Sequence, residues 1–298
     1  MQENFNELMI KKIGDFFVQA KKSHAIIALS GGIDSAYSAM LHVAALGKEN
    51  VLLINLPSRH NSQITKNIAA QVAETLQCQY LVIPIEAMVE NIIHGLQETE
   101  AKITWPKINQ SHENIYARCR CNVIASLAND YDALFPCNAN LSEIVIGYGT
   151  LYGDISGYAC PLGSLWKSEV YAQARLLAQQ MQINLPAEIF TIHASAELGL
   201  HQDVTKNLGD PMVDGYHEKL LRFWHEHAGK AEFYQETVTA TKEKQLENLL
   251  ELTAAESALF REMFSNETEI LNDLAYFWQL YSGPGKFKQI QAPPVLMV

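Results

Sequence analysis

The residues best suited to chemistry form one short stretch near the N-terminus, Ser30-Gly31-Gly32-Ile33-Asp34-Ser35. It follows an apolar run at 25–29 and precedes a segment of helical periodicity. The two glycines allow backbone N–H groups to turn inward, and a helix N-terminus adds partial positive charge, so the stretch suits a bound phosphate. It lacks the lysine of a Walker A loop and the spaced glycines of a dinucleotide fingerprint.

An aspartate in such a loop carries a further implication. Asp34 would repel phosphate unless a cation lay between them, so the sequence predicts Mg²⁺. Ser30 and Ser35 can donate hydroxyl hydrogen bonds to phosphate oxygens. The alternative is a tight strand-to-helix turn in which Ser35 or Asp34 merely caps the helix.

The elements that must position this loop alternate between strands and helices. Apolar runs at 25–29, 51–56, 80–85 and 133–137 predict buried strands. Helical patterns occupy residues 1–22, 34–46, about 62–76, 86–96, 114–129 and 167–181. This alternation predicts a parallel sheet covered on both faces, an α/β doubly wound fold. From about Val213 the chain becomes helical and aromatic, and we interpret those aromatic side chains as core or subunit contacts rather than as a cofactor site.

The composition limits the partners. Lys+Arg 22 against Asp+Glu 33 gives a net charge of −11, which disfavours nucleic acid and requires a local positive site for any phosphate ligand. The five cysteines show no CxxC pair and no nucleophile motif, so we expect reduced thiols in a cytoplasmic protein. The N-terminus lacks a signal-peptide layout, and we expect no membrane association. The histidines share no metal-ligand spacing.

Further stretches support one family. They are Pro57-Ser58-Arg59-His60, the run 114–120, Asn140-Leu141-Ser142-Glu143, the run 147–154, Pro161-Leu162 with Lys167, Ser195-Ala196-Glu197-Leu198, and the run 286–294. With the loop they make the chain similar, along nearly its whole length, to NAD synthetases of the N-type ATP pyrophosphatase families. The run 57–59 and the Gln-Ala-Pro-Pro tail resemble the synthetase half of the glutamine-dependent branch, without its amidotransferase half.

The resemblance implies a reaction and a fold. ATP adenylates the nicotinate carboxylate of deamido-NAD, pyrophosphate leaves, and ammonia displaces AMP to give NAD. The implied fold is adenine nucleotide alpha hydrolase-like, with 1–298 as a single NAD synthetase-like domain and 213–298 as its helical C-terminal part. It also implies a homodimer with the substrate site at the subunit boundary. A separate glutaminase subunit is a further possible partner.

The same resemblance implies roles for individual residues. Asp34, Lys167 and Ser195 would be catalytic, and Asp34 with Glu143 would hold Mg²⁺. Deamido-NAD would contact Arg118, Arg120, Phe287 and Lys288. Arg118 and Arg120 lie two apart on a helix and do not share a face, so one can point into the site while the other pairs elsewhere. We favour Arg118 for the substrate contact. ATP would contact Ala28, Leu29, Ser30, Gly31, Gly32, Ile33, Asp34, Ser35, Arg59, Asn138, Lys167 and Ser195. For Arg59 a salt bridge is an equal alternative, and for Lys167 the alternative is a solvated side chain.

Two departures leave other functions open. Relatives commonly have Thr-Gly-Asn where this chain has Asn138-Ala139-Asn140, and a lysine where it has Ile192. Either another cation such as Lys206 compensates, or the enzyme is slow, or the substrate differs. The rivals are amidation of nicotinate mononucleotide, glutamine-fed synthesis with a separate amidotransferase, and a nucleotide-binding subunit that has lost turnover. A transfer-RNA-modifying relative is disfavoured by the net charge.

Overall fold

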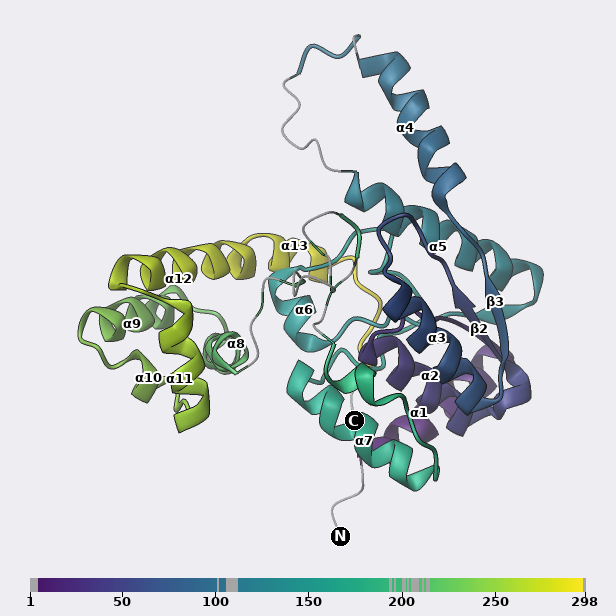
Figure 1. Cartoon of the computed structure of the whole chain (residues 1–298), viewed down its shortest axis with the longest axis horizontal. Helices are drawn as coiled ribbons and strands as arrows, with labels where there is room; N and C mark the ends of the chain where they lie inside the picture. Colours follow the sequence, from purple (N-terminus) through teal and green to yellow (C-terminus); the bar gives the residue numbers. More distant parts are fainter. Residues whose placement is uncertain are drawn as a thin grey trace.

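A four-stranded parallel sheet organises the α/β body, from which the C-terminal helices extend to one side (Figure 1). The computed structural model describes residues 5–100, 102–105, 112–192, 195, 197–199, 202, 204, 209–210, 212 and 215–296. The strands are β1 (His24–Ala28), β2 (Val51–Asn55), β3 (Gln79–Val82) and β4 (Ala133–Leu134). Their order is β3-β2-β1-β4, and all neighbouring pairs are parallel. The chain therefore builds outward from β1 to β3 and then reverses to place β4 on the other side of β1.

Helices cover both faces of the sheet, as the alternating pattern predicts. Ala25 and Ile27 of β1 pack in one core, and Ile26 between them packs in another. Successive residues of β1 therefore point to opposite cores, as they do in a strand that is buried on both faces. The first core holds α1 (Phe5–Ala20), α2 (Ile33–Leu46), α3 (Gln63–Leu76) and α7 (Lys167–Gln180). The second holds α4 (Glu86–Glu100) and α5 (Glu113–Asp130).

The C-terminal part is helical and has an aromatic core, as expected. Its helices are α8 (Tyr216–Glu226), α9 (Ala231–Lys242), α10 (Leu246–Leu249), α11 (Ala254–Met263), α12 (Glu267–Ser282) and α13 (Pro284–Gln289). Trp224, Phe260 and Phe277 are buried together with Val145 and Ile146 of α6 (Leu141–Ile146). The short helix α6 thus lies where the C-terminal helices meet the α/β body (Figure 1). The sequence patterns did not predict α6.

Two strands differ from the buried strands that the apolar runs predicted. β3 ends at Val82 and is largely exposed, because it lies at the edge of the sheet. β4 has only two residues, because Phe135 and Cys137 turn away to pair with another segment: Tyr158 N–H donates to Phe135 O, and Cys137 N–H donates to Ala159 O. The C-terminal tail pairs with the segment that follows residues 158–159, since Cys160 N–H donates to Pro294 O at 2.8 Å. In the described part of the chain, the connections also contain the short 3₁₀ helices Lys48–Asn50 and Ala187–Phe190.

Two further findings concern the cysteines and the apolar character of the helices. All five cysteines are unpaired thiols. Within the described ranges, no helix combines the length and apolar character needed to cross a membrane.

Candidate active site

The loop between β1 and α2 opens into a large cavity. Because the strand order reverses between β1 and β4, the carboxyl ends of these two strands flank a topological switch point, where ligands of α/β sheets bind. Residues 28–34 line a cavity of about 450 Å³ there. That volume is typical of a pocket for one nucleotide-sized ligand.

Glycine is required at one position of the loop. Gly31 has a φ of +95°, and a Cβ on it would lie 2.2 Å from the carbonyl oxygen of Thr65. The loop's hydroxyl groups bind within the loop: Gly32 N–H donates to Ser30 Oγ at 3.2 Å, and Ser35 Oγ donates to Gly32 O at 2.9 Å. Ser35 is buried and does not line the cavity. Its hydroxyl therefore holds the turn in this structure.

Amide side chains from the neighbouring strands hold the start of the loop. Asn55 at the end of β2 donates to Leu29 O at 2.7 Å, and Asn138 beyond β4 donates to Ala28 O at 3.3 Å. Two carbonyl groups that would repel an anion are thereby bound to donors. Asn138, expected to contact ATP, does not itself line the cavity.

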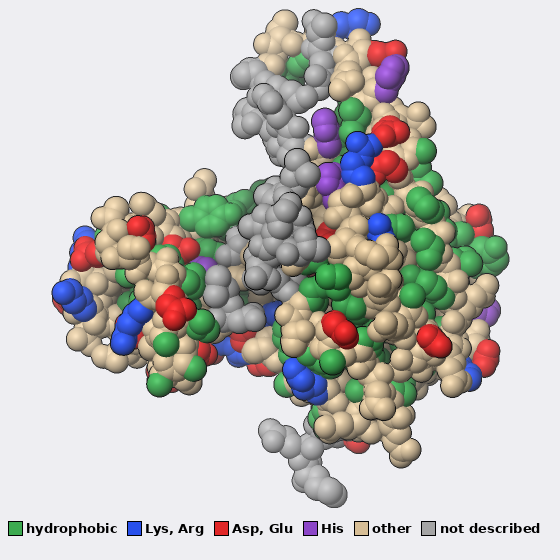
Figure 2. All heavy atoms as spheres, in the orientation of Figure 1, with side chains coloured by type: hydrophobic (Ala, Val, Ile, Leu, Met, Phe, Trp, Pro, Cys, Tyr) green, Lys and Arg blue, Asp and Glu red, His purple; other side chains and the backbone are tan. Residues whose placement is uncertain are grey.

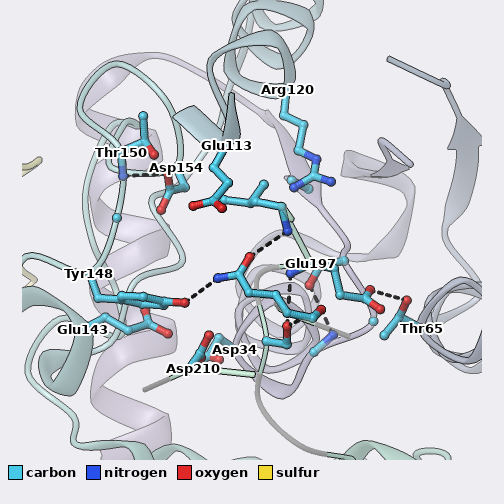
Figure 3. A pocket seen from close by; sticks show the side chains of 18 of the residues that line it. Asp34, Thr65, Glu113, Arg120, Glu143, Tyr148, Thr150, Asp154, Glu197 and Asp210 are labelled. Atoms are coloured by element: carbon cyan, nitrogen blue, oxygen red, sulfur yellow. Dashed lines mark hydrogen bonds between the residues drawn. The ribbon is translucent and has the colours of Figure 1, made fainter. Parts of the chain in front are cut away.

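Asp34, Glu143 and Lys167 meet on one side of the cavity (Figure 3 labels the two carboxylates). Lys167 Nζ forms an ion pair with Asp34, and Asn140 Nδ2 donates to the other Asp34 oxygen at 3.0 Å. Asn140 and Glu143 also form a reciprocal capping box at the start of α6, with both hydrogen bonds at 3.1 Å. The capping box explains why α6 starts here, and it directs the Glu143 carboxyl toward Asp34.

Burial changes the acidity of these groups. Burial, and then repulsion by Asp34, raises the pKa of Glu143 well above its usual range. Burial alone would lower the pKa of the Lys167 ammonium, but the carboxylates of Asp34 and Glu143 raise it. The lysine is therefore firmly charged, and a cation stabilises this acidic corner. Sequence reasoning predicted all three residues, and the structure brings them together.

Ser195 lines another part of the cavity wall. Its Oγ donates to Gln202 O at 3.0 Å and accepts from Glu197 N–H at 3.2 Å. Gln202 in turn donates to the Tyr148 hydroxyl at 2.6 Å (Figure 3). Asp210 points toward Asp34 and Glu143 from the same wall. Gln202 and Asp210 were not predicted, because they lie outside any periodic pattern.

Glu197 fastens this wall to α3. It is 2% exposed and has a φ of +46°, an unusual conformation for a residue with a side chain. It accepts hydrogen bonds from Thr65 Oγ1 at 2.6 Å, Ser62 N–H at 3.0 Å and Asn61 Nδ2 at 3.2 Å. The resemblance placed Glu197 in a motif but gave it no role; here it joins the segment around Ser195 to the N-terminus of α3.

A second polar group lies at the other end of the cavity (Figure 3). Arg120 donates to Leu56 O at 3.1 Å and to Asn61 Oδ1 at 2.9 Å, and burial lowers the pKa of its guanidinium. Asp154 accepts from Thr150 N–H at 2.8 Å, and burial raises the pKa of its carboxyl. Lys288 donates to the carbonyls of Gly147 and Gly149. This end combines two cations, Arg120 and Lys288, with the carboxyl groups of Asp154 and Glu113.

Three other predicted residues do not line the cavity. Arg118, the arginine favoured for substrate contact, is exposed and donates to Leu151 O at 3.2 Å, whereas Arg120 faces inward. Helical spacing separates the two arginines, but only packing decides which faces the sheet. Phe287 is exposed. Arg59 is ion-paired with Glu86 and Glu90, the salt-bridge alternative, near histidines that gather where α4 leaves the body (Figure 2).

Ile192 lines the cavity at the position where relatives were expected to carry a lysine. It is partly buried against the main core. The basic side chains among the described lining residues are Arg120, Lys167 and Lys288, and only Lys167 contacts Asp34. Lys206, the suggested substitute, lies outside the described residues.

In the part of the chain that the structure describes, no group of three or more His, Cys, Asp or Glu is arranged for a metal ion by protein ligands alone. His217, for example, contacts Asp273 in the C-terminal helices. Any Mg²⁺ at Asp34 and Glu143 would therefore need ligand or water oxygens as well, as Mg²⁺ sites at nucleotides commonly do.

Known proteins have sequences related to this chain. Residues 7–255 match the family model described as NAD synthase. A glutamine-dependent NAD(+) synthetase from Aquifex aeolicus is 34% identical over 177 residues, which cover 59% of this chain and 30% of that protein. An NH(3)-dependent NAD(+) synthetase from Helicobacter hepaticus is 33% identical over 193 residues, covering 63% of this chain and 68% of that protein.

A solved structure confirms the fold. The NH3-dependent NAD synthetase from Campylobacter jejuni, in complex with the nitrate ion, has a TM-score of 0.59 and 23% identity, covering 94% of this chain and 95% of that one. The predicted adenine nucleotide alpha hydrolase-like fold is therefore correct. The chain spans about a third of the Aquifex relative's length, 30%. Because the family model matches well over half of its residues, the chain belongs to the NAD synthase family.

Proposed function

We propose that this chain uses ATP to convert deamido-NAD to NAD, with ammonia as the nitrogen donor. An oxygen of the nicotinate carboxylate would attack the α-phosphorus of ATP, and the bond to pyrophosphate would break. Ammonia would then attack the acyl carbon and lose a proton as AMP leaves. The observation that carries the proposal is the meeting of the Ser30–Ser35 loop with Asp34, Glu143 and Lys167 at the topological switch point.

The loop side of the cavity would bind ATP. Backbone N–H groups at the N-terminus of α2 would bind the leaving pyrophosphate, and the Lys167 ammonium would contact its oxygens. Ser195 would contact the nucleotide from another part of the cavity wall. Two other residues predicted to contact ATP, Arg59 and Asn138, do not line the cavity. Asn138 would act indirectly, by fixing the loop carbonyl of Ala28.

The residues present fit Mg²⁺. Asp34 and Glu143 offer the hard carboxylate oxygens that this ion prefers, and the Lys167 ammonium already pairs with Asp34, so the corner accommodates positive charge. Mg²⁺ bound there would neutralise the charge that develops on the leaving pyrophosphate. The chain's own part is to hold the two carboxylates in place, through the Asn140 hydrogen bond and the capping box of α6.

The opposite end of the cavity would take the nicotinate half of deamido-NAD. Arg120 and Lys288 supply the positive charge that a carboxylate requires. A cavity of about 450 Å³ is too small for ATP and a whole dinucleotide together, so the adenosine half would extend outside it. Arg118 and Phe287, which lie outside the cavity, would contact that half.

A homodimer would explain how the extending half is covered. The resemblance implies a substrate site at a subunit boundary, and α4 carries an exposed apolar stripe, Met88, Ile92 and Leu96, spaced by four residues. We expect Ile92→Glu to convert a dimer to a monomer in light scattering, and Val18→Glu, at an exposed position of α1, to leave the dimer unchanged. A monomeric native protein would contradict this assembly.

We place the reaction in the cytoplasm, where ATP is available and free cysteines persist.

One assay tests the proposed function. AMP release from ATP is measured with deamido-NAD or nicotinate mononucleotide as the acid, and with ammonium or glutamine as the donor. We expect turnover with deamido-NAD and ammonium, rising with pH as free ammonia increases, and none with glutamine alone. Preference for the mononucleotide would change the substrate. ATP binding without AMP release would indicate a nucleotide-binding subunit and overturn the proposal.

A further inference from the structure

Lys167 is the first residue of α7, so the position of its backbone depends on how this helix begins. The first N–H groups of a helix have no partner within it. Here Trp166 N–H donates to Glu169 Oε2 at 2.9 Å, Lys167 N–H to Ser142 Oγ at 3.1 Å, and Ser168 N–H to Glu218 Oε2 at 2.9 Å. Three successive donors are therefore held by α7 itself, by α6 and by α8.

The contribution of α8 is a network rather than one contact. Glu218 also accepts from Ser168 Oγ at 2.5 Å. Arg222, one turn further along α8, donates to Glu218 Oε1 and to Glu169 Oε1, both at 2.9 Å. Its guanidinium carbon lies 5.0 Å from the centre of the Trp166 ring. Arg222 thus joins the two carboxylates that bind the first turn of α7, and it packs on the residue before Lys167.

This network is not what holds α8 in the fold. Leu220, Leu221 and Trp224 bury the apolar face of α8 in the aromatic core of the C-terminal helices. Glu218 and Arg222 are spaced by four residues and lie on another side of the helix, toward α7. The polar pair therefore has a local effect: it fixes the first turn of α7.

We propose that Glu218 and Arg222 are positioning residues for Lys167. They thereby couple the C-terminal helices to the acidic corner of the cavity, where Asp34 and Glu143 lie. The physical path runs from α8 through Ser168 and Trp166 to the Lys167 backbone, and from Lys167 Nζ to Asp34. A lysine that must reach both Asp34 and a phosphate tolerates little displacement of its backbone, because small misplacements of contacting groups cost large factors in rate. This inference rests on the proposed role of Lys167 in ATP binding.

The test is a double-substitution cycle between Glu218 and Lys167, with ATP affinity by calorimetry and kcat and KM from AMP release as readouts. Glu218→Gln keeps the size of the side chain but removes the charge that binds Arg222. We expect it to weaken ATP binding and kcat/KM for ATP by about tenfold, with an unchanged KM for ammonia. In a Lys167→Met background the same change should have no further effect.

Two other variants separate positioning from general stability. Glu247→Gln breaks a similar pair in the C-terminal helices, Glu247 with Arg261 at 2.7 Å, far from α7, and should leave ATP binding unchanged. Arg222→Lys keeps one charge but cannot bridge both carboxylates as a guanidinium does, and should give a smaller loss than Glu218→Gln. Thermal unfolding verifies that each variant is folded.

The outcomes distinguish this inference from the proposed function. Equal losses from Glu218→Gln in the native and Lys167→Met backgrounds would overturn positioning while leaving ATP-dependent turnover intact. An equal loss from Glu247→Gln would do the same. Native protein that binds ATP without releasing AMP would refute the proposed function, and the cycle on ATP affinity would still decide the positioning role. Native protein without ATP affinity would refute both.

Discussion

At the scale of single residues, the site consists of charged groups whose partners are already in place. Lys167 is paired with Asp34, Arg120 is bound to Asn61, and Lys288 is bound to two backbone carbonyls. A substrate would therefore exchange partners with these side chains rather than meet bare charges. Such exchange keeps the groups oriented before the ligand arrives, at the cost of breaking their present contacts.

The first prediction concerns Asp34 and Glu143. If both serve one Mg²⁺, Asp34→Ala and Glu143→Ala should each abolish most AMP release while the protein stays folded. Their combined effect should be far less than additive, since either change already removes the ion. Steady-state rates across the two single variants and the double variant measure this. Near-native turnover by either single variant would refute the shared ion.

The second prediction concerns Ile192. A charge-assisted contact to a phosphate is worth roughly 1.5–3 kcal/mol, so a cation at this position should measurably strengthen the binding of ATP. If no other cation compensates, we expect Ile192→Lys to raise kcat/KM for ATP by about tenfold or more, because Lys167 is the only basic residue of the described lining that contacts Asp34. Ile192→Met is the control, since it adds length without charge. If the native enzyme is active and Ile192→Lys leaves kcat/KM for ATP unchanged, another cation already fills this position.

At the scale of elements, the carboxyl ends of β1, β2 and β4 act together. Asn55 beside the end of β1 and Asn138 beyond β4 bind the carbonyls of Leu29 and Ala28, while the turn itself closes through Ser30 and Ser35. α3 completes the site, because its Thr65 carbonyl lies against Gly31 and its Thr65 hydroxyl binds Glu197. The loop is therefore fixed from three directions.

The third prediction uses two adjacent glycines of this loop. Gly31→Ala would place a Cβ 2.2 Å from Thr65 O at a φ of +95°, so the loop or α3 must move. We expect a clear drop in Tm and at least tenfold weaker ATP binding. Gly32→Ala is the matched control: its φ is −86°, and its Cβ would meet only Ser30 Oγ at 3.4 Å. Equal effects of the two changes would contradict this account of the turn.

At the scale of the whole molecule, buried polar contacts join distant segments of the α/β body. His42 of α2 is fully buried, with Nδ1 2.7 Å from Ser38 O and Nε2 2.9 Å from the Tyr158 hydroxyl. The first contact suits a protonated Nδ1, and the second then suits an unprotonated Nε2 that accepts from the tyrosine. Burial lowers the pKa of His42 to about 4, so the imidazole is neutral in the folded protein.

The fourth prediction follows from this shift. Below pH 6.5 the unfolded chain binds a proton at His42 that the folded chain does not accept until about pH 4. The free energy of unfolding should therefore fall as the pH falls through this window, by up to about 3 kcal/mol from this residue. His42→Gln should flatten that part of the profile in chemical denaturation, whereas His94→Gln, at an exposed position, should not. Parallel profiles for native protein and His42→Gln would contradict the prediction.

The amino-acid sequence alone predicted the elements whose signals are local. Apolar runs and helical periodicity predicted the strands, the helices and their alternation, because burial of a strand or a helix face leaves a regular trace. The glycines of the loop and the ordered motifs predicted Asp34, Glu143 and Lys167 as one site. The family resemblance, rather than any periodic pattern, related Glu143 to Asp34.

Only the tertiary structure decided the rest, because it depends on packing between segments far apart in sequence. Helical spacing separates Arg118 from Arg120, but contact with the sheet and the cavity decided that Arg120 faces inward. β4 is short because Phe135 and Cys137 pair with residues 158–159 instead of β1. Gln202 and Asp210 belong to a segment without periodicity, and the link from Glu218 to the start of α7 joins residues fifty positions apart. Sequence patterns report which side of an element is buried, whereas the folded chain determines what lies against it.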